Sequence, residues 1–345
     1  MPSEERIHHS IDRAYKKAKR VNFDINIDKW ILFSDHHRGS GDEADDFKQC
    51  KSTYEAALKH YYDLDYGLGL LGDVEELWEN KIQAPLKLYE DTIKLEELFN
   101  QSTRFFRIWG NHDDFWREKI VFRHFFKDSY QNIQCHESVV IDCFRDGAFL
   151  GEIVLIHGHQ GSWFSEKLVT ISRFFVRYGW RNFQRITGVK LTSASKDLKL
   201  KSKTDHAMYS WSEKNQKVLI CGHTHQPVFM SGTHLDHLIH ELHIESYDEK
   251  KKDLEMQLVK LQKNRTHIHA PGDRIPLYFN TGCCSYADGD ITGIELSSKG
   301  LSLVKWSKST YQKSVLNKVV LEHLFDKPHI HKNKREGTEE DDSCD

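Results

Sequence analysis

The 345-residue chain is predicted to be an α/β protein, a four-layer α/β/β/α sandwich in which two mixed β-sheets pack face to face, flanked by helices. Three observations predict this class. Apolar, strand-like runs alternate with helix-like segments up to about residue 110, a β-hairpin pattern follows near residue 140, and further strand pairs come late in the chain. Five of the apolar runs also lead into Asp, Asn or His, which predicts one shared site at the strand ends.

The first elements alternate as in βα units. A strand at Trp30 to Phe33 precedes a helix-like segment, and a strand at Gly67 to Leu71 precedes a helix that begins after Pro85. A third strand ends at Gly110. This alternation predicts a largely parallel sheet with its ligands at the carboxyl ends of the strands.

The later elements predict a second, more antiparallel sheet. The apolar runs Val139 to Ile141 and Glu152 to Ile156 flank a turn at Asp146-Gly147, as in a hairpin. Further strands are predicted at residues 277–280, 291–296 and 301–306. Two sheets packed face to face with helices outside give the four layers.

Residues 29–310 are predicted to form one domain, because the polar strand ends cannot be divided without splitting one site. Residues 1–28 are predicted to form an N-terminal helical extension, a basic helix around Arg13 to Arg20 followed by a connector. Two helical insertions are predicted at about 161–210 and 232–270. Residues 311–345 are predicted to be a C-terminal extension with a disordered acidic tail.

Composition narrows the class of protein. A formal net charge of -3 gives no overall signal for a nucleic-acid partner. No apolar run approaches the roughly 20 residues that cross a bilayer, and the N-terminal region carries charges where a secretion signal would be apolar. We therefore expect a cytoplasmic protein. The seven cysteines lack CxxC spacing and are expected to be buried free thiols.

Seven nitrogen and oxygen donors follow the ends of the five strands. They are Asp35, His37, Asp73, Asn111, His157, His223 and His225. Seven donors are too many for one tetrahedral zinc and suit two ions that share a carboxylate. Asp73 is the natural bridge, so the sequence predicts a site for two metal ions.

The order of these blocks resembles the calcineurin-like metallophosphoesterase superfamily. The family pattern is D-x-H, G-D-x-x-E, G-N-H-D/E, a lone His after an apolar strand, and G-H-T-H, and each block is present here in that order. The resemblance implies hydrolysis of phosphoester or pyrophosphate bonds by a hydroxide that bridges two divalent metal ions and attacks phosphorus in line. Manganese is the first expectation for the metal, with iron or zinc as alternatives.

The resemblance also implies a role for each residue. The first metal would be held by Asp35, His37 and His225, the second by Asn111, His157 and His223, and Asp73 would bridge them. His112 would stabilise the transition state or protonate the leaving group. Asp113 would orient His112, and Glu76 would tie together the backbone of the ligand loops. His36 and His159 match no ligand and are predicted to be hydrogen-bonding neighbours.

The insertion after His157 is predicted to be a lid over the metals. Arg173, Arg177 and Arg181 fall four residues apart and would line one helix face, where an anion would offset their repulsion. That anion could be a diphosphate, a nucleotide or a lipid headgroup, and aromatic neighbours allow peripheral membrane contact. The alternative is a basic lid that exposes its arginines to water.

The substrate is left open by the sequence. The lone His followed by Gly and the basic insertion resemble the UDP-2,3-diacylglucosamine hydrolase branch, which favours a lipid-linked or nucleotide diphosphate. A nuclease or a cyclic or oligonucleotide phosphodiesterase is the alternative within the superfamily, and it would need a basic track. A non-catalytic scaffold of the same fold is the third interpretation. The histidines at 234, 237, 240 and 243 are interpreted as a solvated helix face.

Overall fold

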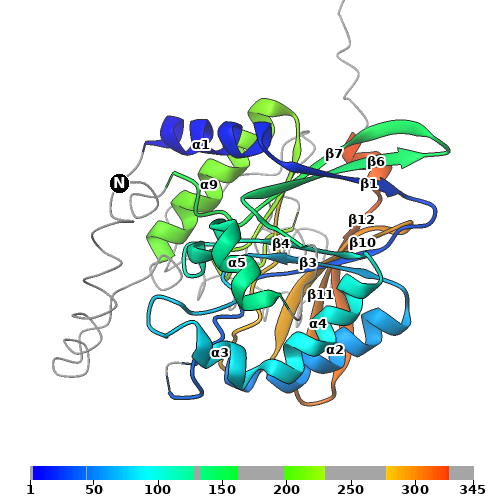
Figure 1. Cartoon of the computed structure of the whole chain (residues 1–345). Helices are drawn as coiled ribbons and strands as arrows, with labels where there is room; N and C mark the ends of the chain where they lie inside the picture. The colour runs from blue at the N-terminus through cyan, green and yellow to red at the C-terminus, as the bar shows by residue number, and fades with distance from the viewer. Residues whose placement is uncertain (1–2, 44, 128–132, 162–197, 230–276, 326–345) are drawn as a thin grey trace, which may run out of the picture.

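The computed structural model describes residues 3–43, 45–127, 133–161, 198–229 and 277–325. Its elements form four layers (Figure 1). The helices α1 (Glu4–Lys16) and α9 (Leu198–Asn215) cover a five-stranded sheet, and α2 (Lys51–Asp63) and α4 (Glu90–Gln101) cover a seven-stranded sheet. The two sheets face each other between these helices, which confirms the predicted fold class.

The seven-stranded sheet is mixed and has the order β12-β11-β10-β2-β3-β4-β5. Its strands are β2 (Trp30–Phe33), β3 (Gly67–Leu71), β4 (Phe105–Ile108), β5 (Cys135–His136), β10 (Ile291–Ser297), β11 (Gly300–Ser307) and β12 (Gln312–Val319). The strands β2 to β5 pair in parallel, as the βα pattern predicts. The late hairpin β10–β11 joins this sheet because β10 pairs antiparallel with β2, so the implied assignment of the late pair to the second sheet is wrong.

The five-stranded sheet has the order β1-β6-β7-β8-β9. Its strands are β1 (Lys19–Asp24), β6 (Ser138–Arg145), β7 (Ala148–Ile156), β8 (Val218–Cys221) and β9 (Tyr278–Asn280). The hairpin β6–β7 is confirmed, and its turn residues Asp146 and Gly147 both have positive φ, as in a two-residue hairpin turn.

The N-terminal region differs from its prediction. The helix α1 begins after Ser3, whose side chain accepts a hydrogen bond from the backbone N–H of Arg6, and it ends at Lys16. The basic residues Lys19 and Arg20 belong to β1, so the predicted connector is a strand that pairs in parallel with β6. Most residues of β1 are polar, and Phe23 is the one residue of the strand that is completely buried. The strand therefore lacks the alternation of apolar and polar residues by which strands are predicted.

The sheets extend beyond the predicted limits of 29 and 310. The strand β1 precedes residue 29, and β12 continues the seven-stranded sheet to Val319 by pairing with β11. The helix α9 runs past residue 210 to Asn215 and packs on β8 and β9, so it belongs to the outer layer of the sandwich. The insertion at 232–270 and the acidic tail lie outside the described residues.

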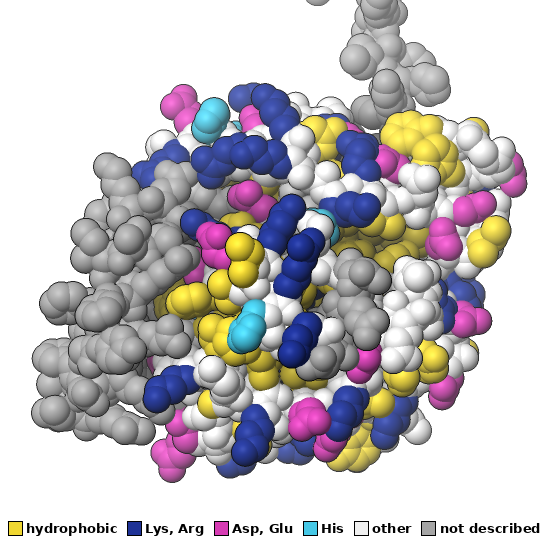
Figure 2. Space-filling model, viewed as in Figure 1, with side chains coloured by type: hydrophobic (Ala, Val, Ile, Leu, Met, Phe, Trp, Pro, Cys, Tyr) yellow, Lys and Arg dark blue, Asp and Glu magenta, His cyan; other side chains and the backbone are white. Residues whose placement is uncertain are grey.

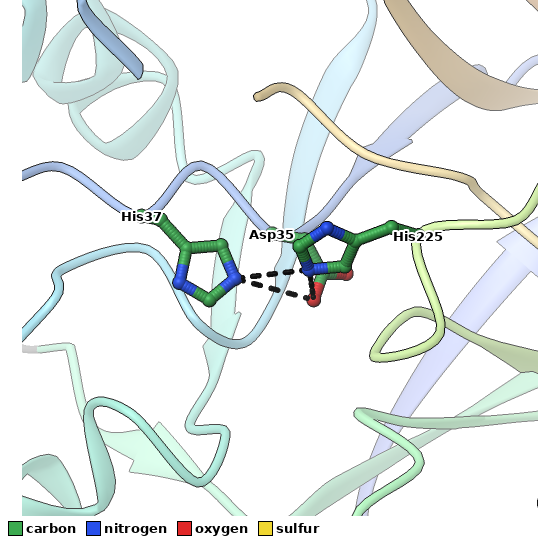
Figure 3. Close-up of side chains that lie close together, drawn as sticks. All are labelled: Asp35, His37 and His225. Carbon is green, nitrogen blue, oxygen red and sulfur yellow. Dashed lines mark hydrogen bonds and ion pairs between the residues drawn. The ribbon is translucent and has the colours of Figure 1, made fainter. Parts of the chain in front are cut away.

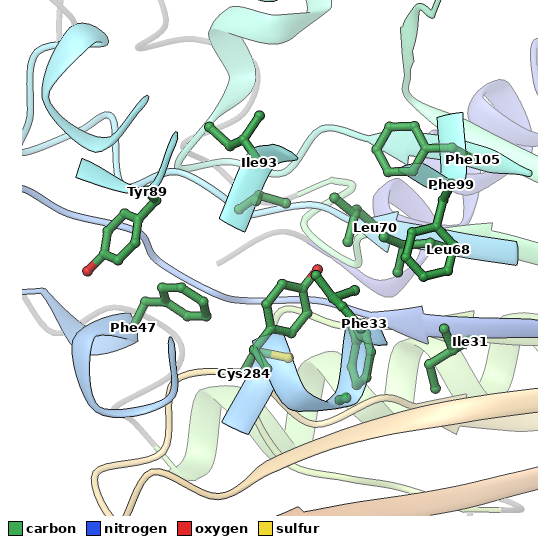
Figure 4. Packing of buried hydrophobic residues seen from close by; sticks show 14 of the residues in the cluster. Ile31, Phe33, Phe47, Leu68, Leu70, Tyr89, Ile93, Phe99, Phe105 and Cys284 are labelled. Atoms are coloured by element: carbon green, nitrogen blue, oxygen red, sulfur yellow. The ribbon is translucent and has the colours of Figure 1, made fainter. Parts of the chain in front are cut away.

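Three apolar cores, one between each pair of adjacent layers, hold the sandwich together. Along β2, Trp30 and Leu32 point between the two sheets, whereas Ile31 and Phe33 point toward α2 and α4 (Figure 4). Successive side chains of a strand face opposite sides of the sheet, so a fully apolar strand contributes side chains to the two cores on either side of it. The third core lies between the five-stranded sheet and the helices α1 and α9, where Ile11 and Trp211 are buried.

The remaining described helices are α3 (Gln83–Leu88), α5 (Lys119–Phe126) and α12 (Leu321–Phe325), with single 3₁₀ turns at Asp46–Gln49 and Asp114–Arg117. The six cysteines in the described part of the chain are buried and free, as predicted. Among the described helices, none has both the length and the apolarity to cross a membrane.

Candidate metal centre

The seven predicted donors converge from both sheets. The loops after β2, β3 and β4 carry Asp35, His37, Asp73 and Asn111, and the loops after β7 and β8 carry His157, His223 and His225. Both sheets present the carboxyl ends of these strands at one edge of the sandwich. The structure therefore brings together residues that are far apart in the sequence.

One group of donors consists of Asp35, His37 and His225 (Figure 3). The Nε2 atom of His225 lies 3.2 Å from Oδ1 of Asp35 and 3.0 Å from Nε2 of His37. The Nε2 atom of His37 lies 3.9 Å from Oδ1 of Asp35. Two imidazole nitrogens and a carboxylate oxygen that point at one another form a donor set for a divalent cation.

A second group consists of Asp73, His157 and His223. The Nε2 atom of His157 lies 3.0 Å from Oδ2 of Asp73. The same Oδ2 atom lies 3.9 Å from Nε2 of His37, which belongs to the first group. The carboxylate of Asp73 thus lies between the two groups, where a bridging ligand would lie.

Asn111 supports a metal at the second group by a different observation. Its Oδ1 atom is buried and has no hydrogen-bond partner among the described residues. A buried side-chain oxygen is normally hydrogen-bonded, and one without a partner requires an explanation. A cation beside Asp73 and His157 would supply the missing partner.

Two histidines are held in the tautomer that metal binding requires. The Nδ1 atom of His157 donates to the carbonyl oxygen of Leu71 at 2.8 Å, so Nε2 is the nitrogen available for a cation. The Nδ1 atom of His37 lies 3.0 Å from Oε2 of Glu76, which likewise leaves Nε2 for the first group. A hydrogen bond to the other ring nitrogen is the usual way in which proteins orient a metal-binding imidazole.

The backbone of the ligand loops is left-handed. Ten non-glycine residues in the described ranges have positive φ, and five of them are predicted ligands. They are Asp35 (φ 54), His37 (φ 52), Asp73 (φ 51), His223 (φ 72) and His225 (φ 56). Such conformations cost roughly 1–3 kcal/mol each and cluster at functional sites. The backbone geometry therefore favours a functional role for these loops.

The glycines of the motifs permit the close approach of the loops. A Cβ atom on Gly72 would lie 2.7 Å from Nδ1 of His157, and its φ of 92° also favours glycine. A Cβ on Gly110 would overlap the carboxylate of Asp73, and one on Gly222 would overlap the carboxylate of Asp35. Each glycine therefore makes room for a predicted ligand.

The structure exchanges the predicted supporting roles of Asp113 and Glu76. The carboxylate of Asp113 accepts hydrogen bonds from the backbone N–H of Val74 at 2.9 Å and of Gly110 at 2.6 Å. The carboxylate of Glu76 lies 2.6 Å from Nδ1 of His112. Glu76 therefore faces the imidazole, and Asp113 ties the ligand loops together, which corrects the predicted orientation of His112 by Asp113.

A buried network of alternating charges, which the sequence reasoning missed, lies behind the loops. It runs through Glu96, Arg38, Glu75, Arg107 and Asp113, and all five side chains are fully buried. Arg38 donates to Glu96, Glu75 pairs with Arg107, and Arg107 Nη2 lies 3.3 Å from Asp113 Oδ2. One sign of this network was present in the sequence, since Arg107 is a charged residue flanked by Phe106 and Ile108 within an otherwise apolar strand.

The ionisable donors stabilise one another's charged forms strongly. Burial alone would lower the pKa of His157 and His225, but the adjacent carboxylates of Asp73 and Asp35 raise both values to about 9. Burial opposes ionisation of Asp35, yet His225 and His157 hold its pKa well below its usual range. Burial and the nearby His157 lower the pKa of His223 to about 3.

One predicted residue lacks the expected hydrogen bonds, and several others lie outside the described part of the chain. His36 was predicted to be a hydrogen-bonding neighbour, but among the described residues neither of its ring nitrogens has a hydrogen-bond partner. Its ring packs instead against Tyr54 at a centroid distance of 4.6 Å, and His159 packs against Trp109 at 5.1 Å. The lid arginines Arg173, Arg177 and Arg181, and the histidines from 234 to 243, lie outside the described residues.

Comparison with solved structures gives two similar chains. Vacuolar protein sorting 29 from Cryptosporidium parvum is 13% identical to this chain, with a TM-score of 0.36. The matched region covers 84% of this chain and 95% of that protein's chain. A conserved uncharacterized protein from Streptococcus pneumoniae TIGR4, a predicted phosphoesterase, is 13% identical to this chain, with a TM-score of 0.30. The matched region covers 84% of this chain and 96% of that protein's chain.

No curated protein matches the chain. The family model of calcineurin-like phosphoesterases matches residues 29–227, which is more than half of the sequence and includes all seven donors. The chain therefore belongs to the calcineurin-like phosphoesterase family.

Proposed function

We propose that the protein is a hydrolase of phosphoester or pyrophosphate bonds that uses two divalent metal ions. The observation that carries this proposal is the pair of buried donor groups that share Asp73. Two cations bound there would polarise phosphoryl oxygens and lower the pKa of a water molecule, which provides a nucleophile at neutral pH. Seven donors with mixed nitrogen and oxygen atoms suit manganese, iron or zinc.

The protein's own residues have separate tasks in this proposal. Asp35, His37 and His225 would hold one cation, and Asn111, His157 and His223 would hold the other. His112 has Glu76 at its Nδ1 atom, so Nε2 is the nitrogen that would donate a proton to the leaving oxygen. The burial of Asp35, Asp73 and His157 keeps bulk water from the donors.

For the substrate we propose a lipid-linked or nucleotide diphosphate. The support is the spacing of Arg173, Arg177 and Arg181 in the sequence, since guanidinium groups recognise phosphate by paired hydrogen bonds. Figure 2 shows one face of the molecule, on which Lys and Arg side chains gather in the middle and along the upper edge and acidic side chains lie mostly around them.

The test is an activity assay with the purified protein. After chelation and reloading with Mn²⁺, it should cleave bis-p-nitrophenyl phosphate, and Asp73→Asn should lower the rate by about a hundredfold or more because the shared ligand is lost. Asp65→Asn is the matched control: it also has positive φ, but it pairs with Arg104 on the surface. Equal activity with and without metal, or equal activity of both variants, would overturn the proposal.

A further inference from the structure

The indole of Trp78 stacks on the imidazole of His112. The ring centroids are 4.0 Å apart and the planes are inclined by 22°. The two side chains come from different loops, which are joined by a hydrogen bond from the backbone N–H of Leu77 to the carbonyl oxygen of His112 at 3.1 Å. The stack is therefore built into the junction of the loops that carry Asp73 and Asn111.

The other sides of His112 are also occupied. Its Nδ1 atom lies 2.6 Å from Oε2 of Glu76, and the ring of His37 meets it edge-on at a centroid distance of 4.6 Å. Its backbone N–H donates to Oδ1 of Asp73 at 2.8 Å. With one face against Trp78 and Nδ1 against Glu76, the Nε2 atom is the polar group that remains for a substrate.

The geometry has a physical consequence for proton transfer. The indole packs flat against the imidazole, so it restrains rotation of that ring. Efficient proton transfer requires the donor nitrogen to lie within hydrogen-bond reach of the leaving oxygen. A half-buried tryptophan that holds this ring would therefore act on the rate of proton transfer.

We propose that Trp78 is a positioning residue for His112, an inference that rests on the proposed function. As a water-derived oxygen bonds to phosphorus and the bond between phosphorus and the leaving oxygen breaks, the electron pair of the broken bond stays on the leaving oxygen, which takes the proton carried by Nε2 of His112. A later proton from water replaces the one that Nε2 gives up, while the Nδ1 atom of the ring stays beside Glu76. Trp78 keeps Nε2 aimed at the oxygen throughout.

The experiment compares two substrates that differ in their need for a proton. Phenyl phosphate has a poor leaving group and p-nitrophenyl phosphate a good one. Trp78→Leu should lower kcat for phenyl phosphate by about tenfold and for p-nitrophenyl phosphate by less than about threefold, with KM little changed, because only the poor leaving group depends on the acid. Trp78→Phe keeps a flat ring and should restore most of the loss.

A double variant tests whether Trp78 acts through His112. His112→Asn alone should show the same dependence on the leaving group, and Trp78→Leu should have no further effect in that background. Equal losses for both substrates, additive losses in the double variant, or a lower metal content of Trp78→Leu would overturn the inference. If Trp78→Leu does not fold, Trp78→Met takes its place in the same comparisons.

The outcomes also separate this inference from the proposed function. If the metal-loaded natural protein cleaves neither ester nor bis-p-nitrophenyl phosphate, the proposed function fails. If the natural protein is active but Trp78→Leu keeps the natural dependence on the leaving group, the positioning role alone fails.

Discussion

The carboxylate of Asp73 lies 3.0 Å from Nε2 of His157, although the two residues follow strands of different sheets. Both side chains are buried, and Gly72 makes room for the imidazole. The contact exists because the two sheets pack with the carboxyl ends of β3 and β7 at one edge. The donor groups therefore depend on the packing of the whole sandwich, and changes away from the donors should affect metal binding.

Gly110→Ala should abolish metal binding and also destabilise the fold. The new Cβ would overlap the carboxylate and the backbone of Asp73. Gly147→Ala is the control, because no atom lies within 4 Å of its new Cβ and the change adds only the cost of a positive φ, about 1 kcal/mol. Calorimetric titration with Mn²⁺ checks the prediction, and an unchanged affinity of Gly110→Ala would contradict it.

Glu75→Gln should destabilise the fold by about 3–5 kcal/mol, because it removes one of the two buried carboxylates that pair with the buried Arg107. The carboxylate of Glu75 also accepts a hydrogen bond from the indole of Trp116 at 2.7 Å. Glu90→Gln, which removes an exposed ion pair with Lys94, should leave the denaturation midpoint nearly unchanged. Urea unfolding of the three proteins provides the comparison, and equal midpoints would argue against the buried network.

Glu76→Gln and Asp113→Asn should have different effects. Glu76→Gln removes the charge that faces His112 and His37, so kcat should fall about tenfold or more. Asp113→Asn weakens the acceptor of three backbone N–H groups, so it should lower metal affinity and stability more than kcat at saturating metal. Kinetics at saturating Mn²⁺ and metal titrations distinguish the two, and a reversed pattern would restore the role first predicted for Asp113.

The metal-free protein should lose stability as the pH rises from about 6.5 to about 9. The pKa values of His157 and His225 are raised to about 9, so their protons stabilise the folded state fully below pH 6.5 and are lost as the pH passes 9. The loss should be on the order of a few kcal/mol. With Mn²⁺ bound, cations replace these protons, so the midpoint should stay nearly constant over the same range. Thermal unfolding with and without chelator checks this, and parallel curves would contradict it.

Much of the fold and the donor set could be predicted because the signals are local. An apolar run that leads into Asp, Asn or His marks both a strand and the loop after it, and all five such runs are strands. The edge strands β1 and β12 lack this signal, since their side chains are largely polar or exposed. Pairing across long separations, such as Ile294 with Leu32, is not visible in either segment alone.

The supporting residues could not be assigned from spacing. Glu76 and Asp113 lie next to ligands in the sequence, and only the direction of each side chain decides which one faces His112. Arg38 and Arg107 are charged residue types that usually lie at the surface, yet they are buried because Glu96, Glu75 and Asp113 neutralise them.

The sequence by itself determined which chemical groups the protein offers, since residue types and their order place Asp, Asn and His after apolar strands. The tertiary structure alone decided that Asp73 lies between two donor groups, because that position depends on two sheets meeting at one edge. It also decided how the ring of His112 is held, between Glu76 and Trp78, because contacts between loops depend on distances that no local pattern carries.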